Sequence, residues 1–250
     1  MYSIKKENLI EGKNVILETI NSNKTIRKIF LLKGFKDKAI VEKLDYLKQQ
    51  GTIVKYLERN EFESFSINNK NQGIIAEIED YKYSTVEEIL DFAKEKNEKP
   101  FLLILDSITD PHNFGAIIRT AVAVGVHGII IKSREQCMVN DTVYKTSTGL
   151  VNFIKIAKVT NLSKTIQMLK EYGIWFYGAS MEGENIYKTK FNDYLAVVIG
   201  AEGDGIKKLV KENCDVIVSI PMSNNVNSLN ASVSTGIILY EIKRQFSAIK

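Results

Sequence analysis

The sequence predicts an α/β protein in two parts: a small α/β module in residues 1–82 and a larger parallel α/β domain in residues 100–250, joined by a linker in residues 83–99. Two observations carry this prediction. From Phe101 onward, continuous apolar runs alternate with amphipathic stretches, as in a parallel sheet that helices bury on both faces. Before that point, shorter strand-like and helix-like segments form a separate group, which ends in a charged stretch before Pro100.

The N-terminal module alternates between helix and strand patterns. Ile40, Leu44 and Leu47 recur at the spacing of one helical face, and Gly51 is expected to end that helix. The expected elements are a helix in 11–21, a strand in 26–34, a helix in 37–51, and strands in 52–58 and 73–80. No long apolar helix dominates this part, which favours a compact sheet-and-helix module.

The linker is expected to contain a helix, since one apolar face runs along residues 84–99. A capping box can begin this helix in two ways, through Ser84 with Glu87 or through Thr85 with Glu88.

The larger domain is expected to alternate regularly between strands and helices. The predicted strands are 101–106, 128–133, 153–159, 174–180, 195–202 and 216–222, and the predicted helices are 113–125, 140–149, 161–173, 205–214 and 227–246. Ligands of such sheets bind beyond the carboxyl ends of the strands. Three polar segments follow predicted strands there, in residues 106–120, 200–205 and 220–232.

Composition and charge exclude several classes of protein. The 250 residues are 44% hydrophobic and 26% charged, with no apolar run near the roughly 18 residues that a membrane span needs. The net charge of +4 favours a polyanionic partner but is not gathered in a tail. Cys137 and Cys214 lie far apart, so neither a disulfide framework nor a zinc site is expected. With no secretory signal at the N-terminus, we expect a cytoplasmic protein without a membrane partner.

The first polar segment, DSITDPHNFGAIIRT, begins a helix. Pro111 and Asn113 suit the start of that helix, and Gly115 permits close backbone approach. Arg119 follows on the same helix, where its guanidinium can clamp an RNA phosphate in a bidentate manner. The alternative is a capped helix whose arginine pairs with a surface carboxylate.

The other two segments are also open to two interpretations. GAEGDG contains three glycines, and Glu202 is the one charged residue between the first two of them. The segment either brings its backbone close to a ligand or forms a plain strand-to-helix turn. IPMSNNVNSLNAS gathers polar side chains before the last helix, where Ser228 or Asn227 is expected to be the N-cap. The two histidines, His112 and His127, are interpreted as incidental rather than catalytic.

Together these segments resemble the three motifs of the SpoU/TrmH family of RNA ribose 2′-O-methyltransferases. The matching runs are DPHNFGAIIRTA at 110–121, VIGAEGDGI at 198–206 and IPMSNNVNSLNASVSTGIILYE at 220–241. The run LDSITDPHNFGA and the N-terminal module resemble most closely the subgroup that methylates a guanosine of bacterial large-subunit (23S) ribosomal RNA.

The resemblance implies a fold and an assembly that the residue patterns do not. It implies a trefoil-knot (SPOUT) catalytic domain, a ribosomal-protein-like RNA-binding domain at the N-terminus, and a homodimer. It implies S-adenosylmethionine as cofactor, S-adenosylhomocysteine as product and no metal. The residues that it places at the reacting groups are Arg119, Asn113, Glu202, Ser228 and Asn230. The residues that it places at the cofactor are Gly200, Ile220, Leu229, Ala201, Gly205, Met222 and Ser232.

The predicted function is therefore methylation of a ribose 2′-hydroxyl in structured RNA, with a guanosine of 23S rRNA as the first choice. Arg119 is expected to orient the target phosphate, which then accepts the proton, or to act while transiently neutral; an arginine resists the second role because it holds its proton at ordinary pH. The alternatives are a tRNA ribose 2′-O-methyltransferase, a resistance-type enzyme acting elsewhere in ribosomal RNA, and a non-catalytic RNA-binding protein on the same scaffold.

Overall fold

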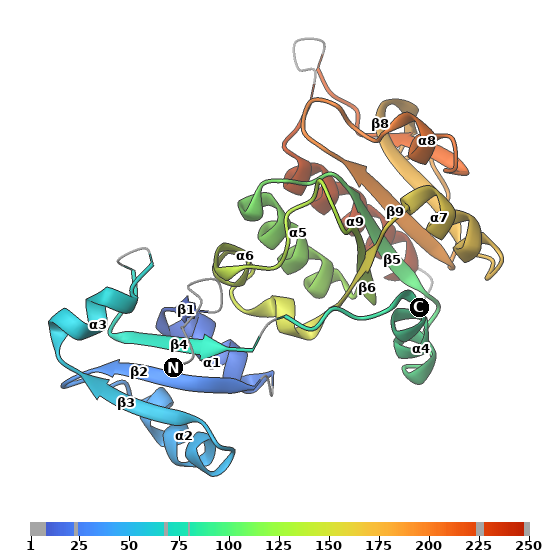
Figure 1. Cartoon of the computed structure of the whole chain (residues 1–250). Helices are drawn as coiled ribbons and strands as arrows, with labels where there is room; N and C mark the ends of the chain where they lie inside the picture. The colour runs from blue at the N-terminus through green and yellow to red at the C-terminus, as the bar shows by residue number, and fades with distance from the viewer. Residues whose placement is uncertain (1–8, 23–24, 68–69, 80, 224–227, 248–250) are drawn as a thin grey trace. The chain divides into compact units, whose positions relative to one another are not determined.

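The chain folds into two compact units in a computed structural model that describes residues 9–22, 25–67, 70–79, 81–223 and 228–247 (Figure 1). Unit 1 comprises residues 1–82 together with 139–153, and unit 2 comprises residues 83–138 together with 154–250. The assignment of 139–153 to the N-terminal unit was not predicted from the sequence. Residues 83–99 belong by their contacts to unit 2.

Unit 1 is built on a four-stranded sheet in the order β1-β4-β2-β3. β2 and β3 are parallel, and the other neighbouring pairs are antiparallel. Its elements are β1 (Leu9–Glu11), α1 (Lys13–Asn21), β2 (Ile26–Leu32), α2 (Lys38–Gln49), β3 (Ile53–Leu57), α3 (Arg59–Phe65), β4 (Ile74–Ile78), α6 (Asp141–Thr146) and the 3-10 helix η2 (Leu150–Phe153). The predicted helices and strands of this region are present, whereas β1 and α3 were not predicted.

A buried ion pair joins the 139–153 segment to the N-terminal strands. Glu11 on β1 is 1% exposed and accepts a hydrogen bond from Lys145 Nζ of α6 at 2.7 Å. Its other oxygen accepts the Ser66 hydroxyl and the Ile67 backbone N–H. Burial alone would raise the Glu11 pKa, but these hydrogen bonds outweigh it and hold the pKa below its ordinary value.

Unit 2 contains a six-stranded sheet, parallel throughout, in the order β10-β8-β9-β5-β6-β7. Its strands are β5 (Phe101–Asp106), β6 (Gly128–Lys132), β7 (Lys155–Val159), β8 (Trp175–Asn185), β9 (Leu195–Gly200) and β10 (Val216–Ser219). The predicted parallel α/β architecture is confirmed. β8 runs five residues beyond its predicted end at position 180, because its polar extension pairs with β10 after a register shift.

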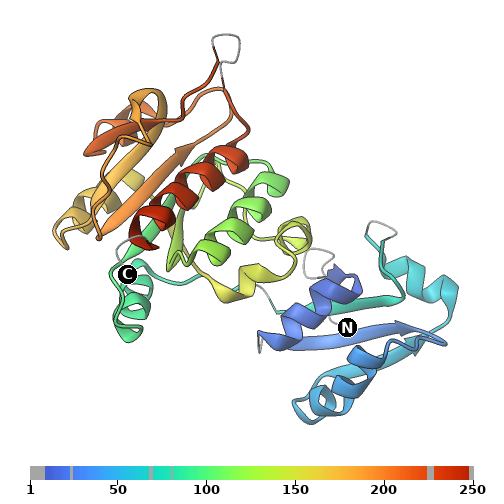
Figure 2. The same cartoon turned by 180° about the vertical axis from the view of Figure 1, so that it is seen from behind.

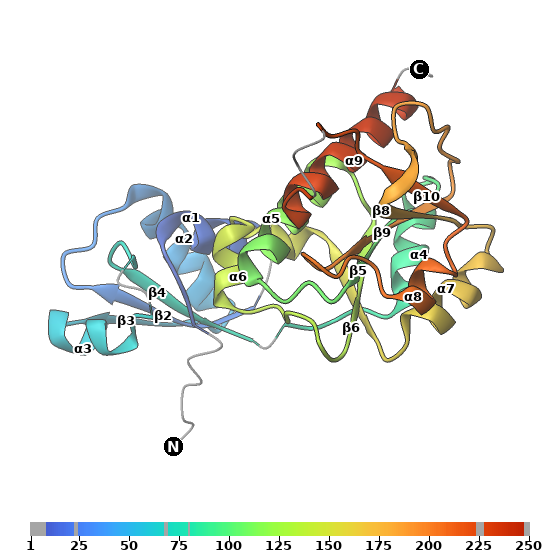
Figure 3. The same ribbon diagram turned by 90° about the horizontal axis from the view of Figure 1, so that it is seen from above.

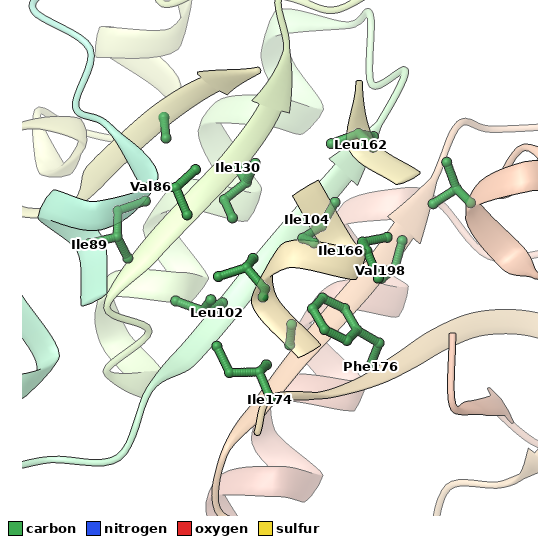
Figure 4. Packing of buried hydrophobic residues seen from close by; sticks show 14 of the residues in the cluster. Val86, Ile89, Leu102, Ile104, Ile130, Leu162, Ile166, Ile174, Phe176 and Val198 are labelled. Atoms are coloured by element: carbon green, nitrogen blue, oxygen red, sulfur yellow. The ribbon is translucent and has the colours of Figure 1, made fainter. Parts of the chain in front are cut away.

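Helices cover both faces of this sheet (Figure 3). They are α4 (Val86–Glu95), α5 (Pro111–Val124), α7 (Leu162–Lys170), α8 (Lys208–Lys211) and α9 (Ala231–Ser247). α4, α7 and α8 lie over one face and bury the core drawn in Figure 4, to which Ile89, Ile104 and Phe176 belong. On the other face α5 and α9 lie side by side (Figure 2).

The helix ends follow ordinary capping chemistry. Of the two predicted capping boxes, the one formed by Thr85 and Glu88 begins α4. Asp110 caps α5, Pro111 occupies its first position, and Gly125 ends it in the left-handed conformation.

The N-cap predicted for α9 was wrong. The helix begins at Ala231, and Asn230 Oδ1 accepts the backbone N–H groups of Ser232 and Val233. Ser228 lies before that turn, and Asn227 falls outside the described residues. None of the helices that the structure describes is both long and apolar enough to cross a membrane.

Candidate active site

A cavity of about 260 Å³ lies in unit 2 at the carboxyl ends of β9 and β10 and beside the middle of β8. The second and third polar segments supply much of its lining. The lining residues that the sequence singled out are Gly200, Ala201, Glu202, Gly205, Ile220, Met222, Ser228 and Leu229. Its position agrees with the rule that ligands of parallel sheets bind beyond the carboxyl strand ends.

The loop that follows β9 forms one wall of the cavity. Its two ends are fastened to each other, since Ala201 and Gly205 exchange backbone hydrogen bonds of 3.1 and 3.0 Å. Gly205 has a φ of +65°, which favours glycine. At Gly200 a Cβ atom would stand 2.0 Å from the Gly205 carbonyl carbon, so a larger residue would force this loop open.

A hydrogen-bonded cluster joins all three polar segments beside this wall. Asn113 Nδ2 donates to Glu202 Oε1 at 3.0 Å, and Asn230 Nδ2 donates both to Asn113 Oδ1 at 2.9 Å and to Glu202 Oε1 at 2.6 Å. The backbone N–H of Ala231 also reaches Glu202 Oε1, at 3.2 Å. Segments separated by up to 117 positions therefore meet at one carboxylate.

Arg119 and Ser232 lie outside the cavity lining. Arg119 is exposed on α5, and among the described residues it makes no hydrogen bond and no ion pair. The surface carboxylate of the alternative interpretation is thus missing from the described part of the chain. Ser232 donates its hydroxyl and its backbone N–H to Asn230 Oδ1 and so helps to orient the amide of that residue.

Sequence reasoning missed part of the cavity. Ala179, Ser180 and Met181 line it from β8, and Lys211 lines it from α8. Lys211 Nζ donates to Ser180 Oγ at 3.2 Å and pairs with Glu182 at 3.1 Å. These four residues were missed because none of them lies in the three polar segments that the sequence singled out.

The remaining reactive side chains have structural surroundings. Burial raises the pKa of the Cys137 thiol to about 11 and that of Cys214 to about 12, so neither is a thiolate nucleophile near neutral pH. His127 Nδ1 accepts the Phe101 backbone N–H, and its Nε2 lies 2.9 Å from Glu98. The described residues contain no group of His, Cys, Asp and Glu arranged to bind a metal.

The sequence compares closely with one family. The profile of the SpoU rRNA Methylase family matches residues 100–240, and the profile described as RNA 2'-O ribose methyltransferase substrate binding matches residues 9–84. The chain belongs to the SpoU rRNA methylase family. The chain is also similar to YacO of Bacillus subtilis, named as a TrmH family tRNA/rRNA methyltransferase, with 40% identity over 94% of both chains.

Two further SpoU-family relatives support the assignment. RlmB of Escherichia coli, a 23S rRNA (guanosine-2'-O-)-methyltransferase, is 39% identical over 88% of this chain and 91% of its own length. The SpoU methyltransferase AviRb of Streptomyces viridochromogenes, solved with AdoMet, superposes with a TM-score of 0.82 at 23% identity, covering 96% of this chain and 90% of that one. At that identity the likeness shows the SpoU fold, which agrees with the parallel sheet described above.

Proposed function

We propose that this SpoU-family protein transfers a methyl group from S-adenosylmethionine to the ribose 2′-hydroxyl of a guanosine in 23S rRNA. The observation that carries the proposal is the cluster of Asn113, Glu202 and Asn230. It brings three separate sequence motifs together beside the cavity, as a working site requires and as a plain helix cap or strand turn does not. The name of the relative RlmB supports the choice of nucleotide and RNA.

The cavity fits S-adenosylmethionine by its chemistry. Ile220, Leu229 and Ile238 offer an apolar wall for an adenine ring, while Glu202 and Asp204 bring negative charge suited to a sulfonium cation. When bound, S-adenosylmethionine supplies a methyl group that its positive sulfur has already activated. The protein is left with two tasks, which are alignment of the 2′-oxygen and help with its deprotonation.

Arg119 takes part in both tasks in this proposal. Its guanidinium has no partner among the described side chains, so its five donors are available to a target phosphate. The phosphate that it orients then accepts the hydroxyl proton. Asn113 and Asn230 fix Glu202 at the edge of the cavity, and Ser228 lies beside Leu229 in the lining.

The wider organisation is part of the same proposal. Residues 1–82 bind the RNA, residues 83–99 link them to a methyltransferase domain in residues 100–250, and that domain contains a trefoil knot. The protein works as a cytoplasmic homodimer. Support for the dimer comes from α9, where Val233 and Tyr240 are 50% and 56% exposed and lie seven positions apart on one helical face.

The experiment maps 2′-O-methyl marks in the RNA of cells with and without this gene. We expect one guanosine mark in 23S rRNA to disappear in the deletion strain and to return with the parent gene. Loss of a mark in tRNA instead would favour the alternative of a tRNA ribose 2′-O-methyltransferase, which the name of YacO also allows. An unchanged map would contradict the proposal.

A further inference from the structure

Asp106, the last residue of β5, is a buried carboxylate that the mechanism above does not use. It is 0% exposed, and its Cα pairs with Gly200, the residue that begins the loop of residues 200–207 after β9. Its Oδ2 accepts the backbone N–H of Lys207, at the other end of that loop, at 2.8 Å. One side chain therefore stands beside the first residue of the loop and holds the last.

The surroundings of Asp106 fix its orientation. Ser107 donates its hydroxyl to Asp106 Oδ1 at 3.2 Å, and Ser107 itself has a φ of +70°, a left-handed conformation that non-glycine residues rarely adopt. Such strain persists where the surrounding structure determines the backbone, and it gathers at functional sites. In this protein the left-handed Ser107 ends β5 directly after Asp106.

The position of the loop determines the shape of the cavity, since residues 200–206 all line it. Within the loop, Ala201 and Gly205 bind each other, but that contact closes the loop without placing it against the sheet. The Lys207 ammonium is held separately by Glu135, at 2.5 Å. The Asp106–Lys207 hydrogen bond therefore ties the backbone at the end of the loop to the carboxyl end of β5.

We infer that Asp106 is a positioning residue for the cofactor: by holding the Lys207 N–H it keeps the 200–207 loop in the shape that binds S-adenosylmethionine. The inference rests on the proposed function, because that assigns the cavity to this cofactor. Asp106 is not itself one of the lining residues of the cavity, so it should govern cofactor affinity and leave the chemical step nearly unchanged.

The test removes the same hydrogen bond from each side in the full-length protein. Asp106→Ala removes the acceptor. Lys207→Pro removes the donor, and the Lys207 φ of −58° already suits proline. The matched controls keep the bond: Asp106→Asn retains an oxygen acceptor, and Lys207→Ala retains the backbone N–H while it removes the ammonium.

Two readouts are measured, calorimetric binding of S-adenosylmethionine and amide hydrogen exchange of residues 201–206 in the cofactor-free protein. Asp106→Ala and Lys207→Pro should each weaken binding by about 10- to 100-fold, the effect of losing a hydrogen bond to a charged group. Both should also exchange faster in the loop, with kcat at saturating cofactor within a few-fold of the parent. Asp106→Asn and Lys207→Ala should stay close to the parent in affinity and exchange.

The outcomes separate this inference from the function on which it rests. A parent that binds no S-adenosylmethionine contradicts the proposed function, while loop exchange still tests the anchor. If Lys207→Pro behaves like Lys207→Ala in loop exchange and in affinity, the inference is overturned, even if Asp106→Ala fails to fold. A fall in kcat with unchanged affinity would also overturn it.

Discussion

Arg119 is the residue on which the proposed chemistry depends most. It is exposed on α5, and no described carboxylate neutralises it. Arg119→Ala should keep the fold and the cofactor affinity but lose turnover by about 10²–10⁴-fold, the usual range for acid–base assistance. Arg119→Lys should recover little, since an ammonium cannot reproduce the planar fork. Single-turnover methylation at saturating RNA and cofactor measures this, and a variant within a few-fold of the parent would remove Arg119 from the mechanism.

At this scale the sequence predicted which residues line the cavity better than it predicted their contacts. Gly200, Ile220 and Leu229 were singled out through motifs and do line it. The contacts of Asn113 with Glu202 were not predictable, because they depend on how β5 and β9 pair in register. Asp106 begins the first polar segment, but as the last residue of a predicted apolar strand it was assigned no role.

At the scale of elements, the buried pair of Glu11 and Lys145 fixes α6 against β1. Lys145→Met leaves the Glu11 carboxylate buried without its cation, and breaking such a pair typically costs about 3–5 kcal/mol. We expect the amides of β1 and β4 to exchange faster in this variant. Lys48→Met, which breaks the exposed pair with Asp45, should cost less than about 0.5 kcal/mol. Equal exchange in the two variants would mean that the buried pair does not hold α6.

The same pair predicts a pH dependence of unit 1. The Glu11 pKa is lowered from 4.5 on folding, so the pair stabilises the folded state fully above that pH. The stability is lost as the pH falls from 4.5 through the lower pKa of the folded state. Between pH 6 and pH 3, the protection of the β1 amides relative to the intrinsic exchange rate at each pH should therefore fall more in the parent than in Glu11→Gln, which has no carboxylate to titrate. A parallel acid response in both proteins would contradict this assignment.

Elements with strong periodicity were predictable, and the short polar ones were not. The alternation from Phe101 onward indicated the parallel sheet, because most of the strands there are continuous apolar runs. α3 escaped prediction since Phe62 is its only buried residue, and β1 is only three residues long. α9 begins at Ala231, later than predicted, because the Asn230 amide oxygen accepts the first free N–H groups of the helix.

At the scale of the whole molecule, the exposed apolar face of α9 bears on assembly. We expect light scattering to give a mass of two 28.3 kDa chains, and Val233→Glu with Tyr240→Glu to give one. Placing two carboxylates in a buried interface is costly unless each finds a partner. Tyr46→Glu, at an equally exposed tyrosine of α2, should leave the dimer intact. A monomeric parent, or a double variant that still dimerises, would contradict the proposed interface.

The proposed methylation of a ribose 2′-hydroxyl of ribosomal RNA with S-adenosylmethionine is the reaction on which the whole function depends. It is tested most directly with the purified protein, unmodified 23S rRNA and S-adenosylmethionine that carries a deuterated methyl group, followed by mass spectrometry of the nucleosides. We expect deuterated 2′-O-methylguanosine, formed by the parent and nearly absent with Arg119→Ala. Label on a base, label on another nucleoside, or no label with a folded and cofactor-binding parent would contradict it.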